Sequence, residues 1–205
     1  MKRPIRYLLM SIALLLIGIV FGLSIYWHMT ALERDIDQSH WVARGLVPDY
    51  NLDVPFPISD TFDPWEKASF PASGVVASST EYFRNMVSNK WFQPYFGLFA
   101  LSGIPTYGGE DPAMFKPENN AWCVTADLIP RYHTLPQGPC PFMFTRNLDI
   151  TRLSEAKADR LRDVPPYGLR GVLVVMTDCS AKFLRPEQIE SDFNPLGFTN
   201  AVLRP

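Results

Sequence analysis

Cysteine, histidine and net charge are all low in this 205-residue sequence, and these shortages exclude several classes of protein. Three cysteines are too few for a scaffold built on disulfides, although one pair could oxidise in an exported body and leave one thiol over. A formal net charge of -2 gives no reason to expect a nucleic acid partner. Apolar residues make up 47% of the chain, which is enough for a folded core.

The motifs of common active sites are also missing. The sequence contains no H-E-x-x-H, C-x-x-C, P-loop or G-x-S-x-G motif. Cys123 and His133 could be a nucleophile and its base, but a buried core residue is the better interpretation of Cys123. Acidic side chains near the glycine-rich stretch match no calcium-loop spacing and are interpreted as a solvated loop: Glu110, Asp111 and Glu118. We therefore expect a protein that is not an enzyme, with no catalytic residues, cofactor, metal ligands or small-molecule substrate.

One apolar segment dominates the N-terminal region. The 21 residues from Tyr7 to Trp27 carry no charge, and about 20 apolar residues are enough for a helix to cross a bilayer. A secretory signal has a shorter apolar region of about 7–15 residues and then small residues at its cleavage site, whereas this segment ends in Tyr26 and Trp27. Tyr7 and Trp27 are placed as interfacial anchors. The sequence predicts a retained transmembrane helix over 7–28 in a single-pass protein that contacts the lipid bilayer.

The charges that flank this segment predict its orientation. Residues 1–6 form a basic leader, whereas the residues that follow the segment are mainly acidic. The positive-inside rule places the leader in the cytoplasm and the chain after about residue 28 outside. Within the segment, Gly18 and Gly22 form a G-x-x-x-G motif, which would let a second helix approach closely.

The remaining chain divides into three parts. Residues 29–44 keep a weak helical periodicity, so they either continue the membrane helix or form a short stalk. Residues 45–77 contain too many prolines for a helix or a central strand and are predicted to be a long extended loop. Residues 78–205 form the body, for which we predict an α+β fold: a small antiparallel sheet with short helices.

Four elements are predicted in the body before its final hairpin. The S-x-x-E pair Ser78 and Glu81 is typical of a capping box and predicts a helix over 79–89. Alternation of side chains from Trp122 predicts a strand, and a second strand is predicted over 142–148. Residues 148–163 are predicted to form a polar helix with three apolar side chains inward: Leu153, Ala156 and Leu161.

A hairpin is the clearest feature near the C-terminus. Two apolar segments, 172–176 and 181–184, flank Asp178 and Cys179, where a tight turn usually has Asp-Gly. Cys179 is therefore expected at a positive φ. Pro186 is well placed to begin a closing helix over 186–192. A Cys123–Cys140 disulfide is not favoured, because antiparallel pairing of Leu128 with Cys140 would place Cys123 near Thr145.

The order of these stretches resembles a known family. The stretches SSTEYFRNMVSN, FGLFALSGIPTYGG, ENNAWCVTADL, FMFTRNLDI and GVLVVMTDCSAKFLRPEQI follow one another over residues 78–189, and the resemblance covers about 78–197. This series is similar to the bodies of pseudopilin-like (prepilin-type) proteins of bacterial type II secretion, whose chains end in a Gly-hydrophobic-Asp-Gly-Ser-x-x-Phe-Leu hairpin. The resemblance implies a pilin-like fold, in which a long membrane-anchored helix carries a small sheet domain outside.

The resemblance also implies a function. It predicts a structural subunit of a type II secretion or pilus-like assembly, in the bacterial inner membrane with its body in the periplasm and other subunits or secretion machinery as partners. The N-terminus departs from the family pattern, since no Gly–Phe junction precedes the apolar segment and that segment contains no glutamate. The alternative is a single-pass, membrane-tethered binding module that does not polymerise.

Overall fold

The computed structural model describes residues 3–46, 74, 76–88, 96–128 and 139–205. The chain divides into two compact units, Met1–Asp35 and Ile36–Pro205. The proline-rich segment predicted over 45–77 lies almost entirely outside the described residues, as does His133.

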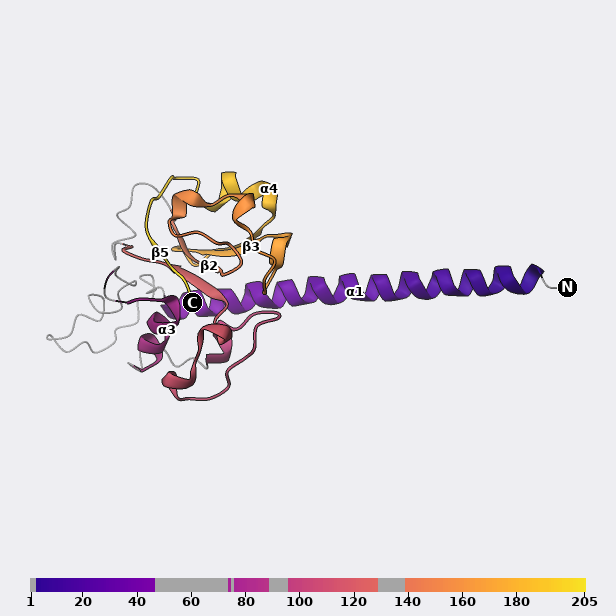
Figure 1. Ribbon diagram of the computed structural model, residues 1–205, viewed down its shortest axis with the longest axis horizontal. Coiled ribbons are helices and arrows are strands. Elements are labelled where there is room, and N and C mark those ends of the chain that lie inside the picture. The colour runs from indigo at the N-terminus through magenta and orange to yellow at the C-terminus, as the bar shows by residue number, and fades with distance from the viewer. Residues whose placement is uncertain (1–2, 47–73, 75, 89–95, 129–138) are drawn as a thin grey trace, which may run out of the picture. The chain divides into compact units, whose positions relative to one another are not determined.

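Helix α1 (Arg3–Leu46) is continuous, so residues 29–44 are helical rather than an irregular stalk (Figure 1). Its only proline is in the first turn, where a missing N–H breaks no helical hydrogen bond.

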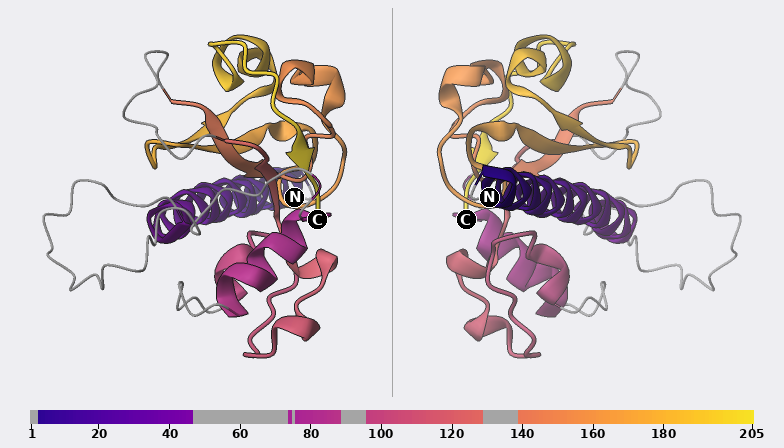
Figure 2. Two further views of the ribbon diagram at one scale, coloured as in Figure 1. Left: turned by 90° about the vertical axis from the view of Figure 1, so that its left-hand side faces the viewer. Right: turned by 90° about the vertical axis from the view of Figure 1, so that its right-hand side faces the viewer.

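A five-stranded antiparallel sheet forms the centre of the second unit (Figures 1 and 2). Its spatial order is β4-β3-β2-β1-β5. Short helices surround it, which confirms the predicted α+β class with one long apolar N-terminal helix. The strands have these bounds: β1 (Trp122–Thr125), β2 (Pro141–Thr145), β3 (Val172–Met176), β4 (Ala181–Leu184) and β5 (Val202–Leu203).

Both faces of the sheet are covered in its middle. Every residue of β1, β2 and β3 is buried, so the alternation seen around Trp122 does not separate a buried face from a solvent face. On one face, Phe144 meets Phe193 edge to face, with ring centroids 5.1 Å apart.

The register of β1 and β2 places Cys123 opposite Phe144, one position from the predicted pairing with Thr145. Cys123 and Cys140 are free, as their predicted separation required.

Helix α3 (Ser79–Ser88) begins with a variant of the predicted capping box. The Ser78 hydroxyl accepts a hydrogen bond from the N–H of Glu81 at 3.1 Å. The Glu81 carboxylate accepts from the N–H of Ala77 at 2.7 Å, one residue earlier than in the standard box. The buried side of α3 packs Phe83 onto Phe99 of η1 (Phe96–Phe99), with centroids 4.1 Å apart. An aromatic cluster thus forms the core on this side of the unit.

The polar helix predicted over 148–163 is absent, and this prediction was wrong. Two 3-10 turns occupy the segment instead, η5 (Leu153–Glu155) and η6 (Ala158–Arg160). The physical reason is a competing partner for the backbone: the Asp149 N–H donates to the Arg160 carbonyl at 2.9 Å, and the Arg162 N–H donates to the Asn147 carbonyl at 2.8 Å. These bonds fold the segment back on itself, so an α-helix cannot propagate through it.

The predicted closing helix is present. α4 (Pro186–Gln188) starts with the proline at its first position and runs directly into η8 (Ile189–Phe193), a π-helical turn. The Gln188 side chain accepts a hydrogen bond from the Arg185 N–H at 3.0 Å, which satisfies a free donor at the helix start. Ile189 and Phe193 are fully buried and hold these turns on the sheet.

Candidate functional site

The apolar segment of α1 leaves its side chains uncovered within its own unit. Large apolar side chains from Ile12 to Trp27 are 46–69% exposed, which is far more apolar surface than a soluble unit leaves in water. By length and composition this is one helix able to cross a membrane, and it lies near the N-terminus. The exposure is the expected state of side chains whose solvent is lipid.

The structure places the predicted anchor residues on this helix. An added Cβ at Gly18 or Gly22 would meet no atom within 4 Å, so both glycines leave open space beside the helix. Trp27 is 66% exposed at the end of the segment. Tyr7 belongs to the helical residues, but its side chain lies outside the described part. Within their own unit, no described residue fills the surface beside the two glycines.

The predicted hairpin residues lie between β3 and β4. The Met176 N–H donates to the Ser180 carbonyl at 2.8 Å, and the Cys179 N–H donates to the Met176 carbonyl at 3.0 Å. The connection is therefore a three-residue loop, in which the third position normally takes a left-handed conformation. Cys179 occupies that position with φ of +63°. The Asp178 carboxylate accepts from the Ser180 hydroxyl at 2.6 Å, which fixes the loop from the inside.

Replacing Cys179 by glycine is expected to stabilise the body. A left-handed residue with a side chain costs about 1–2 kcal/mol, and glycine removes that cost while adding some unfolded-state entropy. We expect Cys179→Gly to raise the unfolding free energy by about 0.5–1 kcal/mol in a urea titration. Cys179→Val, with its β-branched side chain, should lower it. Equal midpoints for the glycine and valine variants would contradict the strain argument.

Gln38 joins α1 to the body within the second unit. Its Nε2 donates to the Leu98 carbonyl at 2.9 Å and to the Ala100 carbonyl at 2.7 Å. These carbonyls lie at and just beyond the C-terminal end of η1, where a helix leaves acceptors without partners. A single amide therefore satisfies two backbone acceptors and fixes η1 beside this stretch of α1.

His40 makes the second such contact, with the hairpin loop. Its Nδ1 lies 2.9 Å from the Cys179 carbonyl oxygen, and since a carbonyl only accepts, this nitrogen carries the proton. Val42, close by on α1, is fully buried. Sequence reasoning assigned no role to Gln38 or His40. The helical periodicity of residues 29–44 indicates that this stretch packs against something. It does not indicate which groups Gln38 and His40 bind, because their partners lie more than 50 residues away in the sequence.

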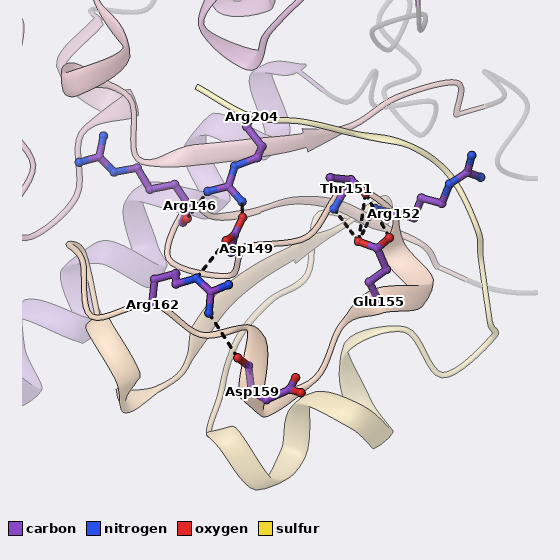
Figure 3. A network of polar contacts seen from close by, with 8 residues as sticks. All are labelled: Arg146, Asp149, Thr151, Arg152, Glu155, Asp159, Arg162 and Arg204. Atoms are coloured by element: carbon purple, nitrogen blue, oxygen red, sulfur yellow. Dashed lines mark hydrogen bonds and ion pairs between the residues drawn. The ribbon is translucent and has the colours of Figure 1, made fainter.

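A polar network links three loops of the sheet domain (Figure 3). The Asp149 carboxylate accepts from Arg162 Nε at 3.0 Å and from Arg204 Nη1 through its other oxygen. Arg204 Nη2 also lies 3.5 Å from the Arg146 carbonyl oxygen. The side chains of Asp149 and Arg204 are each more than a third exposed, so such pairs contribute little stability. Their contribution is positional: they hold the residues that follow β5 against the loops after β2.

The two core thiols lack the properties of a nucleophile. Burial raises the pKa of Cys123 to about 12, with smaller opposing effects from nearby charges, and burial raises the pKa of Cys140 to about 12 as well. Both side chains are fully inaccessible to solvent. A thiolate is the reactive form of cysteine, so neither sulfur is poised for attack at neutral pH.

This difference in exposure predicts the outcome of alkylation. Native protein treated with iodoacetamide at pH 8 is expected to take one label, on the partly exposed Cys179, because Cys123 and Cys140 are buried and protonated. Protein unfolded in urea should take three. Intact-mass measurement distinguishes these outcomes. Two or three labels on the native protein within minutes would show that a core thiol is accessible.

Two further polar groups, one buried and one in the acidic loop, have structural roles. Asn120 is fully buried, and its amide donates to the Ser79 hydroxyl at 3.0 Å while its carbonyl accepts from the Trp122 N–H at 2.9 Å. It therefore ties the start of α3 to β1. In the acidic loop, the Asp111 carboxylate caps η2 (Pro112–Met114) through the Ala113 N–H at 3.0 Å. Among the described residues, no three metal-binding side chains come together.

Comparison with known proteins identifies no relative. No family model, no curated protein and no solved structure matches this chain. The features of this chain that bear on its function are the exposed apolar segment of α1, the contacts of Gln38 and His40, and the sheet.

Proposed function

We propose that this chain is a pseudopilin-like structural subunit of a secretion or pilus-like assembly and not an enzyme. One observation carries the proposal. The helix that bears the exposed apolar segment is the same helix whose later part, through Gln38 and His40, is bonded to the sheet domain. A long helix of this kind, with an apolar first half and a sheet domain bonded to its second half, is the arrangement that the sequence resemblance implies.

The proposed location follows from the same helix. The apolar segment would lie in the bacterial inner membrane, with the basic leader in the cytoplasm and the sheet domain in the periplasm. Other subunits or the secretion machinery would contact the helix. The open surface at Gly18 and Gly22 supports such contacts, because small residues let a second helix approach closely.

A second candidate is a membrane-tethered binding module that does not assemble. The observation in its favour is the absence of a glutamate and of a Gly–Phe junction at the apolar segment. A tethered module needs only the anchor. The two candidates differ in whether the helix contacts other helices and in whether the leader is removed.

Crosslinking tests the assembly directly. Single cysteines placed along residues 12–27, in a chain whose own three cysteines are replaced, are expected to form dimers or larger species in native membranes when oxidised. Crosslinking should peak at positions one helical turn apart on the side of Gly18 and Gly22. Gly18→Leu with Gly22→Leu should weaken it severalfold, whereas Leu16→Ala with Val20→Ala, on another side of the helix, is the matched control. A chain that stays monomeric at every position would support the tethered module.

A further inference from the structure

The two edges of the sheet are not equivalent. Beyond β5, the Val202 N–H donates to the Thr151 carbonyl at 2.9 Å, and the Leu153 N–H donates to the Asn200 carbonyl at 3.1 Å. Arg152 and Ala201 form an antiparallel bridge between these bonds. The backbone beside β5 therefore already has a partner, and this edge of the sheet is closed.

The opposite edge, β4, carries backbone groups with no such partner. Because Met176 and Ser180 form a hydrogen-bonded pair, the alternating antiparallel pattern places the next bonded positions of β4 at Lys182 and Leu184. Ala181 and Phe183 then direct their N–H and C=O groups away from β3. Within the described part of the chain, these four groups have no hydrogen-bond partner.

The open stretch has a defined end. The next outward N–H belongs to Arg185, and the Gln188 side chain already occupies it at 3.0 Å. Among the described residues, the N–H and C=O groups of Ala181 and of Phe183 thus remain without a partner, and the two residues lie about 7 Å apart along the strand. An extended peptide backbone presents complementary groups at that spacing, so the geometry suits an added strand.

The side chains of β4 restrict which strand can bind. Phe183 packs edge to face on Tyr167, with ring centroids 5.1 Å apart on one face of the sheet. Lys182 is exposed on the other face, where its amine donates to the Asp192 carbonyl at 2.8 Å. Arg185, also exposed, follows the strand. The edge therefore presents positive side chains beside its free backbone groups.

These charges disfavour a second copy of the chain as the occupant. Antiparallel pairing of two β4 strands about their centre would place Lys182 directly opposite Lys182, and like charges there are destabilising. Centring the pair on Phe183 instead would place Lys182 opposite Leu184, with no compensating charge. Lysine on an edge strand is also a common device against association between identical sheets.

We propose that the β4 edge binds an extended, acidic, proline-free segment of a partner protein by strand addition, with an Asp or Glu of the partner opposite Lys182. The partner would bond to the backbone of Ala181 and Phe183 and extend the sheet by one strand. This surface lies on the sheet and not on the apolar segment of α1, so it does not depend on whether the chain assembles through its helix.

Two synthetic peptides test the charge preference. They are seven-residue alternating threonine–valine peptides that differ only in a central glutamate or lysine, and fluorescence anisotropy measures their binding to the full chain in detergent micelles. The glutamate peptide is expected to bind about fivefold more tightly, from the usual size of cross-strand charge pairs. Lys182→Glu should reverse the preference. Equal binding of both peptides to both proteins would overturn the proposal.

A proline variant tests the backbone contact separately. The Ala181 N–H points away from β3, so Ala181→Pro removes a donor to the partner and breaks no bond within the sheet. Binding of the glutamate peptide should fall at least tenfold, whereas Ala181→Thr, which keeps the N–H, should bind normally. In the unaltered protein the peptide should slow hydrogen exchange at the Ala181 and Phe183 amides. Unchanged exchange at both amides on peptide saturation would place the peptide elsewhere and overturn the proposal.

Discussion

Two arginines within the apolar segment are expected to release this protein from membranes. Each arginine near the centre of a membrane helix costs about 3 kcal/mol, so Leu16→Arg with Ile19→Arg costs about 6 kcal/mol before the lost apolar contribution is counted. Both side chains are at least half exposed in their own unit, so the variant breaks no packing there. We expect the fraction of the protein that stays with the membrane pellet after alkaline carbonate extraction to fall from most of the material to a small part of it.

A matched pair of substitutions separates charge from side-chain size. Leu16→Phe with Ile19→Phe changes the same positions and keeps the segment apolar, and it should remain with the membrane. If the arginine variant were retained as fully as the phenylalanine variant, the segment would not be the anchor.

Intact mass of the membrane-extracted protein adds a second readout: a mass that includes Met1 or Lys2 shows an unprocessed anchor, and loss of only the basic leader shows prepilin-type processing.

Phe144→Ala is expected to be the most destabilising single substitution considered for the sheet domain. Phe144 is fully buried on the central strand β2 and packs edge to face against Phe193. Removing such a ring costs about 3–5 kcal/mol, because the transfer free energy is lost and a cavity remains. In a chain of this size the melting temperature should fall by about 6–20 °C, measured by near-ultraviolet circular dichroism in micelles.

Leu169→Ala is the control for this substitution. Leu169 is 57% exposed, and truncation of an exposed side chain usually changes stability by less than about 0.5 kcal/mol. Similar melting temperatures for the two variants would mean that η8 does not close the core over β2. A large loss for Phe144→Ala alone would confirm that the closing turns and the sheet share one core.

Local signals predicted several elements from the sequence. The hairpin of β3 and β4, the start of α3 and the proline-led closing turns depend on residues within a few positions of one another. Even the positive φ of Cys179 follows from its place in a tight connection. Such elements can be predicted because turn and cap geometry is specified by the chain nearby.

Long-range partners explain most of what was missed. β5 has only two residues, and its pairing with β1 joins parts of the chain far apart in sequence. The helix expected over 148–163 has the composition of a helix, but hydrogen bonds between its two ends replace the helical ones. The partners of Gln38 could not be predicted either, since a glutamine carries no mark of which distant carbonyls it will meet.

The position of β5 has a consequence for the order in which the sheet can form during synthesis. β1 pairs on one side with β2, which follows soon after it, and on the other with residues that arrive much later; Asn200, for example, is bonded to Ala126, 74 positions before it. A chain that is synthesised in sequence order therefore presents β1 with one side open until residues 202–203 have been made. Completion of the sheet must therefore follow synthesis of residues 202–203, and β1 keeps an unpaired side until then.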